Sequence, residues 1–311
     1  PNTSQVEPVT MKVGAQWSYE DLTDALVDDV LDNPLGFDIL AEQMNLSAHV
    51  YPGIYEFSSG LNNRQIITQL RTGKTKDVPV VIRSHIQGND VFGILASNLE
   101  ADSADIEEAF VQSDIYKDLG MKGDAWACLF QANTYKFNWA STPESIVERF
   151  RREYNSFWTA QRQDKAGRQN LSPVGVSVLA SIVDGESTDL AEMPKIAGVY
   201  LNRLRNRWPL QADPTIMFFV REEGRQRVLN ADKEKDHPYN TYLRQGLPPG
   251  PIMIPSSTAI KAVLEPAEHD YMFFCANPDF SQTHLFAKSL SEHNRNAAAY
   301  HRALNLRGIR R

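Results

Sequence analysis

The sequence predicts an α+β protein with a small N-terminal module, residues 1–76, followed by a larger mixed α+β region, residues 77–311. Near the N-terminus, strand-like alternation such as Val9 to Val13 is followed by glycine and then by a helical pattern, and this order occurs twice. The middle of the chain contains a long apolar helix that starts at Pro173. Near the C-terminus, two short strands flank an Asn-Pro-Asp turn.

The N-terminal module has clear start and stop signals for its elements. Ser18 with Asp21 predicts a capped helix, and Gly73 predicts the end of a second one. The expected elements are strands at 9–13, 54–57 and 77–83, and helices at about 18–26, 37–44 and 63–73. These residues contain neither paired carboxylates nor a nucleophile with a base, so a binding or spacer role is the default for residues 1–76.

Composition bounds the class of protein. With 311 residues, 42% of them hydrophobic, the chain can bury a sizeable core and is expected to form two domains. A net charge of −7 argues against a nucleic-acid partner, which requires a basic surface. No apolar run is long enough to span a bilayer, so the protein is either soluble or anchored through a segment outside this sequence. Cys128 and Cys275 lie among apolar residues and are expected to be buried thiols. No histidine spacing suggests a metal site.

The region between the two strongest patterns is expected to be scaffold. The aromatic residues from Trp126 to Phe137 are expected to be core, and Thr142 begins a long amphipathic helix. The charged segment from Arg221 to Asp236 is typical of a solvated loop. Ser289 with Glu292 predicts a capping box for the last helix, which suffices to explain Glu292.

Glu186 is the candidate catalytic residue. Ser172 and Pro173 are a helix-start signal, and Val178, Ile182 and their neighbours form an apolar stripe that Glu186 continues. A carboxyl group on this stripe faces inward, where desolvation raises its pKa as a general acid requires. The alternative is that Glu186 ends the helix in solvent or pairs with an arginine such as Arg203, because glutamate is rarely buried unless it is paired.

Six short motifs that follow one another in the chain distinguish these alternatives. The motifs are SIVDGEST, VYLNRLR, LQADPT, YNTY, GLPPGPI and SLSEHN. Together they resemble the MltG (YceG-like) family of endolytic murein transglycosylases, over about Phe130 to Tyr300. The resemblance places the family's catalytic glutamate at Glu186, while Asp184 and Gly185 stand where the family more often has glutamate and lysine. Residues 50–74 are similar to the family's LysM-like module, which implies that residues 1–76 bind glycan.

The resemblance implies a reaction and a setting. The bond cleaved would be the β-1,4 bond between N-acetylmuramic acid (MurNAc) and N-acetylglucosamine (GlcNAc) inside peptidoglycan strands, leaving 1,6-anhydro ends without using water. One glutamate would serve as acid and then as base, with no cofactor. The partners would be peptidoglycan glycan strands and cell-wall synthases. Family members face the periplasm from the bacterial inner membrane through one N-terminal helix, which this sequence does not contain.

Polar residues of the same motifs are the candidate substrate-binding groups. Amides, hydroxyls and an aromatic face match the hydroxyl groups and rings of sugars, although about half of such groups are expected to be structural. The candidates are Asn202, Gln211, Asp213, Asn240, Thr241, Tyr242 and Asn294. Asp213 is either a second carboxylate in the site or a residue of an Asp-Pro turn.

Two rival functions remain open from the sequence. In a hydrolytic muramidase, Asp184, Asp189 or Asp213 would activate water. In a noncatalytic wall-binding protein, the N-terminal module would carry the function and Glu186 would be structural. For a single-carboxyl enzyme we expect Asp184→Asn to be nearly silent, since Asp184 would point away from the face of Glu186. We also expect Asn240→Ala and Gln211→Ala to reduce activity while leaving the melting temperature nearly unchanged.

Overall fold

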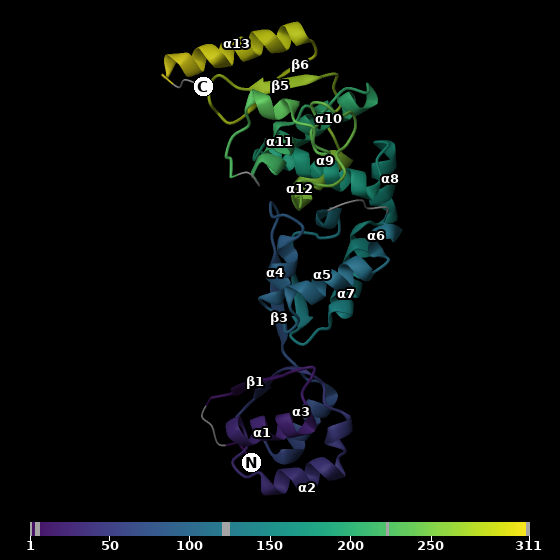
Figure 1. Ribbon diagram of the computed structural model, residues 1–311, viewed down its shortest axis with the longest axis vertical. Helices are drawn as coiled ribbons and strands as arrows, with labels where there is room; N and C mark the ends of the chain where they lie inside the picture. Colours follow the sequence, from purple (N-terminus) through teal and green to yellow (C-terminus); the bar gives the residue numbers. More distant parts are fainter. Residues whose placement is uncertain (1, 4–6, 120–124, 222–223, 309–311) are drawn as a thin grey trace. The chain divides into compact units, whose positions relative to one another are not determined.

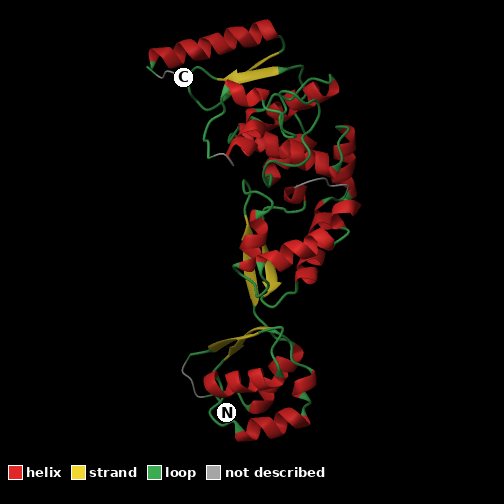
Figure 2. Ribbon diagram, in the orientation of Figure 1, coloured by secondary structure: helices red, strands yellow, loops and turns green. Residues whose placement is uncertain are grey.

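A computed structural model describes residues 2–3, 7–119, 125–221 and 224–308 (Figure 1). Helices make up most of the ordered structure and the strands are short (Figure 2). The helices are α1 (Tyr19–Asp29), α2 (Leu35–Gln43), α3 (Asn63–Thr72), α4 (Asp90–Ala96), α5 (Ser103–Gln112), α6 (Ile115–Asp118), α7 (Pro143–Phe157), α8 (Ala160–Arg168), α9 (Pro173–Glu186), α10 (Met193–Arg205), α11 (Asp213–Val220), α12 (Ser257–Leu264) and α13 (Leu290–Leu306). The strands are β1 (Val9–Val13), β2 (Gly53–Phe57), β3 (Asp77–Ile82), β4 (Asn133–Asn138), β5 (Phe273–Ala276) and β6 (His284–Ala287).

The predicted α+β class is confirmed. Within the described residues the strands pair into three two-stranded sheets, β1 with β2, β3 with β4, and β5 with β6. The first is antiparallel with Val9 opposite Phe57, and the third is antiparallel with Phe273 opposite Ala287. Because a two-stranded ribbon is marginal by itself, each sheet depends on the helices around it for stability.

The N-terminal segment is built on the signals predicted from its sequence. Ser18 and Asp21 form the capping box of α1, and the αL residue Gly73, with a φ of 63°, ends α3. A second capping box, Asn62 with Gln65, begins α3. The buried core of this segment lies entirely within residues 11–70 and is made of Met11, Val13, Leu22, Leu26, Val30, Leu31, Phe37, Ala41, Leu46, Tyr55, Phe57, Ile66, Ile67 and Leu70.

The chain forms two compact units whose boundary differs from the one expected at residue 76. The first unit contains residues 1–81, 92–112 and 134–148, and the second contains residues 82–91, 113–133 and 149–311. The first unit therefore takes in α4 residues, α5 and β4 in addition to the N-terminal segment. These later residues join it because β4 pairs with β3, a contact between distant parts of the chain that local sequence patterns do not reveal.

Helix α9 lies at the centre of the second unit. It packs against α8, α10, α11, α12 and the short helix η2 (Ala125–Cys128). The sequence predicts a single apolar stripe, but every residue from Gly175 to Asp184 is buried. The predicted stripe includes too few buried residues, because Val176 and Ala180, on the other faces of the helix, are also buried in the packed unit.

Two polar side chains of α9 hold the segment that leads into α12. Ser181 Oγ accepts from the backbone N–H of Ile252 at 3.0 Å, and Asp184 Oδ2 accepts from the N–H of Ser256 at 2.6 Å. Ser256 also donates its hydroxyl to Asp184 Oδ1. The buried Asp184 carboxylate therefore has a structural role at Ser256, while the expectation that Asp184→Asn leaves activity nearly unchanged stays a prediction.

The described part of the chain contains no helix that is both long and apolar enough to cross a bilayer. Both cysteines are free thiols, with Cys128 buried and Cys275 partly buried. Burial raises the pKa of the Cys128 thiol. The predicted core aromatics Trp126, Phe130 and Tyr135 are buried.

Candidate active site

The second unit contains a cavity of about 1150 Å³ with Glu186 in its wall. Glu186 and Asp184 come from α9, Asp213, Met217 and Phe218 from α11, and Ile252 and Met253 from the segment before α12. The remaining lining residues are His85, Gln87, Gly185, Pro214, Arg221, Gln226, Arg227, Val228, Leu229, Asn230, Lys233 and His301. The cavity thus combines carboxylates, an apolar wall and several cations, which is typical of a site for a large polar ligand.

Glu186 is the last residue of α9, and its carboxyl group is held by a tyrosine from α10. The Tyr200 hydroxyl donates a hydrogen bond to Glu186 Oε1. The pKa of Glu186 is raised to about 7, and burial is the largest cause. The negative charge of Asp213 also raises this pKa, whereas the hydrogen bond from Tyr200 and the positive charge of Arg203 lower it. The net pKa keeps a substantial fraction of Glu186 protonated near neutral pH, as predicted from its place on the helix.

Helix α10 supplies two groups that the sequence predictions did not assign to the site. Tyr200 is 1% exposed, and burial, together with the negative charge of Glu186, raises its pKa well above 10. It therefore remains a hydrogen-bond donor at neutral pH. Arg203 does not pair directly with Glu186; its guanidinium donates to the carbonyl oxygens of Met272 and Leu210 at 2.8 and 2.7 Å. Both residues lie in the VYLNRLR motif, which was the only signal for them.

Asp213 is both the first residue of a helix and a residue of the cavity. It begins α11, followed by Pro214, and lines the same cavity as Glu186. Its Oδ1 accepts from the Tyr242 hydroxyl at 2.5 Å and lies 3.0 Å from Lys233 Nζ. The sequence left open whether Asp213 is a carboxylate of the site or a residue of an Asp-Pro turn. Asp213 is both, because the start of α11 at this residue places its carboxylate at the end of the cavity wall.

The C-terminal end of α9 and the N-terminal end of α11 approach closely at Gly185. A Cβ atom at Gly185 would lie 2.8 Å from Cβ of Pro214, closer than side-chain carbons normally approach. Glycine at this position therefore lets α11 pack directly against the helix end that carries Glu186. The contact places Asp213 near enough for its charge to raise the pKa of Glu186.

The charged segment after α11 is not the simple solvated loop that its sequence suggests. Arg221, Gln226, Arg227 and Lys233 line the cavity. The short helix η4 (Asn230–Glu234) orders this segment, and its Asp232 is 1% exposed. Asp232 accepts from Arg225 at 2.6 Å and from the N–H of Leu229 at 2.8 Å. A charged segment can be ordered when its acidic and basic side chains pair with one another, as Arg225 and Asp232 do here. The composition of the segment does not show such pairing.

Two of the predicted substrate-binding residues are buried supports of the cavity wall. Asn240 is 0% exposed; its amide donates to the carbonyl oxygens of Lys233 and Lys235 and accepts from the N–H of Tyr242. Thr241 is 2% exposed, and its hydroxyl accepts from the N–H of Ala212 at 3.0 Å. In the structure these side chains fix the positions of Lys233 and of the start of α11, and neither lines the cavity.

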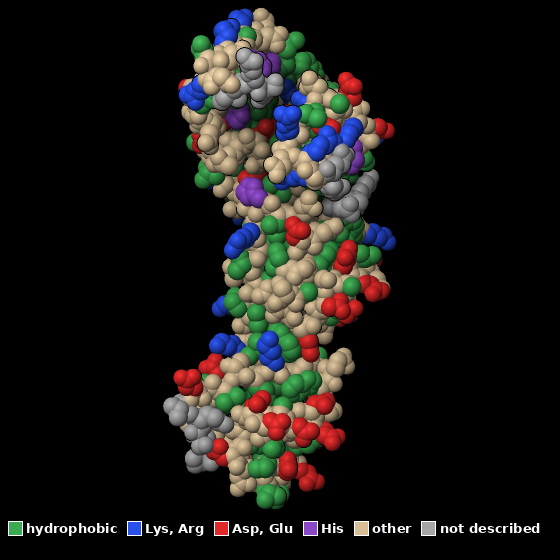
Figure 3. Space-filling model, turned by 60° about the vertical axis from the view of Figure 1, so that its left-hand side comes forward, with side chains coloured by type: hydrophobic (Ala, Val, Ile, Leu, Met, Phe, Trp, Pro, Cys, Tyr) green, Lys and Arg blue, Asp and Glu red, His purple; other side chains and the backbone are tan. Residues whose placement is uncertain are grey.

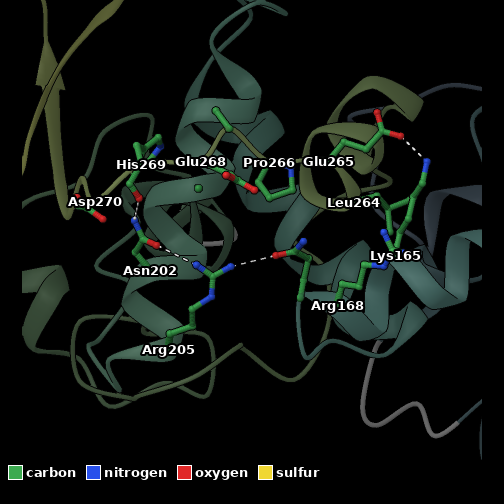
Figure 4. Close-up of a pocket in the computed structure, with 13 residues that line it drawn as sticks. Lys165, Arg168, Asn202, Arg205, Leu264, Glu265, Pro266, Glu268, His269 and Asp270 are labelled. Atoms are coloured by element: carbon green, nitrogen blue, oxygen red, sulfur yellow. Dashed lines mark hydrogen bonds and ion pairs between the residues drawn. The ribbon is translucent and has the colours of Figure 1, made fainter.

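The other candidates are spread over the second unit. Tyr242 adjoins the cavity through Asp213, whereas Gln211 and Asn294 are exposed and do not line it. Asn202 lies in a different cavity of about 550 Å³, where its amide donates to the carbonyl oxygen of His269 and accepts from Arg205 (Figure 4). Of the seven candidates, Asp213 alone lines the cavity with Glu186, Tyr242 adjoins it through its hydrogen bond to Asp213, and the other five lie outside it.

The chemistry of the site is acid–base chemistry of carboxyl groups. Among the residues that the structure describes, no three His, Cys, Asp or Glu side chains are grouped so that they could hold a metal ion. The cavity offers one carboxyl group with a pKa near 7, Glu186, and two further acidic side chains: Asp184, which accepts from Ser256, and Asp213, which is tied to Tyr242 and Lys233. The first can both donate and accept a proton near neutral pH.

Comparisons with known proteins agree with the motifs. The chain is 29% identical to the endolytic murein transglycosylase of Bacillus subtilis over 266 residues, which cover 80% of this chain and 72% of that protein. It is 28% identical over 192 residues to the endolytic murein transglycosylase of Streptococcus pneumoniae, 59% of this chain and 34% of that protein. A crystal structure of a yceG-like protein from Listeria monocytogenes superposes with a TM-score of 0.60 at 27% identity, covering 94% of this chain and 99% of that chain. The YceG-like family profile matches residues 11–299, so the chain belongs to the YceG-like family.

Proposed function

We propose that this protein is an endolytic murein transglycosylase that cleaves the β-1,4 MurNAc–GlcNAc bond within glycan strands and leaves 1,6-anhydroMurNAc ends. The general activity follows from its relatives, which are named endolytic murein transglycosylases. The observation that carries the proposal is the position of Glu186, whose pKa of about 7 is combined with a place in the wall of a large polar cavity. One such group suffices for a transglycosylase because it can act as acid and then as base.

The proposed reaction has two proton transfers through Glu186. The protonated carboxyl group donates its proton to the glycosidic oxygen as the bond from C1 to that oxygen breaks, so the GlcNAc side leaves as an alcohol. The Glu186 carboxylate then takes the proton of the MurNAc 6-hydroxyl as O6 bonds to C1. The carboxyl group ends in its starting state and no water is consumed. Tyr200 would orient Glu186 through its hydrogen bond in both half-reactions.

Asp213 supports the proposed reaction electrostatically. Positive charge develops at C1 in the transition state, and a carboxylate fixed in the same cavity stabilises it. Tyr242 and Lys233 hold Asp213 Oδ1 in place, so the carboxylate does not have to reorganise during the reaction. Its negative charge also contributes to the raised pKa of Glu186.

The presence of Asp213 in the cavity also favours one alternative, a hydrolytic muramidase. Most glycosidases pair an acid with a second carboxylate that activates water or attacks the sugar. We favour the transglycosylase because Asp213 Oδ1 is already engaged by two donors and because the relatives are named for transglycosylation. Mass analysis of the products separates the two, since hydrolysed ends contain one water more than 1,6-anhydro ends.

The test of the proposal is Glu186→Gln, assayed on purified glycan strands. Glutamine keeps the size of the side chain and can still accept from Tyr200, but it cannot transfer the proton. We expect turnover to fall by about 10²- to 10⁴-fold while binding of the strands is retained. Asp189→Asn, a nearby acidic residue outside the cavity lining, is the matched control and should retain activity. Full activity of Glu186→Gln would exclude Glu186 as the acid, and reducing ends from the wild type would exclude the transglycosylase.

The proposal also covers the role of the N-terminal segment and the place in the cell where the protein acts. A LysM-like role for residues 1–76 is supported by a cavity of about 460 Å³ whose lining includes Asn33, Asn63 and Arg64, since amides and a guanidinium suit sugar hydroxyls. Reduced retention of an Arg64→Ala variant on insoluble murein would support it, and unchanged retention would count against it. The proposed place of action is the periplasmic face of the inner membrane, beside cell-wall synthases, as the resemblance implies.

A further inference from the structure

His85 lines the Glu186 cavity in a backbone conformation that histidine rarely adopts. Its φ is 69°, in the left-handed region, where the Cβ atom of any residue except glycine crowds the following carbonyl oxygen. Two backbone hydrogen bonds keep the chain in this conformation. The N–H of His85 donates to the carbonyl oxygen of Ile254 at 2.9 Å, and the N–H of Ile254 donates to the carbonyl oxygen of Ile86 at 2.8 Å. The conformation is therefore imposed by the packed segment before α12, and the histidine side chain is held at a strained position.

Two neighbouring side chains orient the His85 ring. Its Nδ1 lies 2.9 Å from Ser84 Oγ, and its Nε2 lies 3.4 Å from Asp184 Oδ1. Asp184 does not depend on the ring for its hydrogen bonds, because it accepts from the N–H of Ser256 at 2.6 Å and from the Ser256 hydroxyl at 3.0 Å. A structural partnership with Asp184 therefore does not account for a histidine here, where glycine would adopt the same backbone conformation without strain.

The place of His85 beside Glu186 suits a residue that contacts a ligand. Asp184 and Glu186 are both carboxyl residues of the last turn of α9 and both line the cavity. His85 reaches this end of the helix at Asp184, whereas α11 reaches it at Gly185. On the face shown in Figure 3, histidine side chains reach the surface over the second unit, the unit that contains His85. With 51% of its side chain exposed, the His85 ring is open to a ligand that reaches Glu186.

We propose that His85 is a substrate-binding residue of this cavity, whose ring forms a hydrogen bond with a hydroxyl or acetamido group of the glycan beside Glu186. Imidazole suits these groups because it offers a donor and an acceptor, and a ring that is oriented in advance loses less entropy on binding. The backbone strain at residue 85 is then the cost of presenting this ring to the cavity. This role of His85 rests on the proposed function and adds a residue to its substrate site.

The experiment measures the binding of purified glycan strands to Glu186→Gln protein, so that no substrate is consumed. Adding His85→Gly should raise the dissociation constant by about three- to tenfold, the contribution of one hydrogen bond. The melting temperature should stay the same or rise, because glycine removes the strain. His85→Asn, which tolerates the left-handed region and keeps hydrogen-bonding groups, should bind more tightly than His85→Gly. Arg207→Gly is the matched control, since exposed Arg207 has a φ of 55° outside the cavity lining and should lose no binding.

Each outcome decides for or against the role of His85. Unchanged binding by His85→Gly overturns it, and so does a His85→Asn variant that binds no better than the glycine variant. A fall in the melting temperature of His85→Gly also overturns it, because the ring would then be a structural group. If His85→Gly weakens binding but the wild type cuts no strands, only the proposed function is contradicted. If the wild type forms 1,6-anhydro ends and His85→Gly binds normally, only the role of His85 is contradicted.

Discussion

Glu186→Gln should change the stability of the protein in a manner that depends on pH. An ordinary glutamate has a pKa of 4.5, whereas burial raises that of Glu186 to about 7 in the folded protein. Between these values the unfolded chain has released the proton of this carboxyl group and the folded chain has kept it. The free energy of unfolding of the wild type therefore falls as pH rises from about 4.5 to about 7 and changes no further above that through this group.

The size of the effect follows from the same two values. At about 1.4 kcal/mol per pH unit, the interval from 4.5 to about 7 corresponds to at most roughly 3 kcal/mol. Glutamine carries no charge at any pH and keeps the hydrogen bond from Tyr200, so the variant escapes this loss. We expect the variant to match the wild type near pH 4.5 and to be more stable by up to about 3 kcal/mol above pH 7.

Urea unfolding of both proteins at a series of pH values measures this difference. Glu265→Gln is the matched control, because Lys165 lowers the pKa of the Glu265 carboxyl group and its removal should produce a trend of the opposite sign. The reasoning is refuted if the difference between Glu186→Gln and wild type does not grow between pH 4.5 and 7. It is also refuted if the glutamine variant is the less stable protein at pH 8.

Four further substitutions test the surroundings of Glu186 and the structural role of Asn240. Tyr200→Phe removes a donor that lowers the pKa of Glu186, so the pH at which cleavage falls to half should rise; Asp213→Asn removes a charge that raises this pKa, so the same midpoint should fall. A pH–rate profile for each variant measures both, and a shift of both midpoints in the same direction would contradict the assignment. Asn240→Ala should lower the free energy of unfolding by about 2–4 kcal/mol, because it leaves two partly buried carbonyl oxygens and a partly buried N–H without their partner. Gln211→Ala, an exposed amide, should stay within about 0.5 kcal/mol in the same denaturant assay, and equal losses for the two would refute the structural role of Asn240.

Asn240 shows where local sequence reasoning fails. An amide beside aromatic residues in a polar stretch suits sugar hydroxyls, and the sequence favours that function. In the structure the same amide donates to the carbonyl oxygen of Lys233 in η4 and accepts from the backbone N–H of Tyr242. An amide side chain can form hydrogen bonds with a sugar or with backbone groups equally well. Only the folded chain decides which of the two lies within hydrogen-bond distance.

The sequence predicted helix starts and ends correctly where the interactions that form them lie within a few residues of one another. Ser172 with Pro173 begins α9, Ser18 with Asp21 caps α1 and Gly73 ends α3, because each signal satisfies backbone groups within one turn of its own helix. The inward position of Glu186 follows from helical spacing alone. The order of the six motifs was sufficient for the family, which the comparison with the whole chain confirmed.

The sequence by itself thus determined the helix that carries Glu186, the inward position of that residue and the family. The tertiary structure alone decided which residues surround that acid. Tyr200 reaches Glu186 because α10 packs against α9, and Asp213 and Arg221 line the Glu186 cavity because α11 packs against α9. The physical reason is that a pKa, an ion pair or a cavity wall depends on distances in space. Residues 14, 27 and 35 positions from Glu186 acquire those distances only when the helices pack.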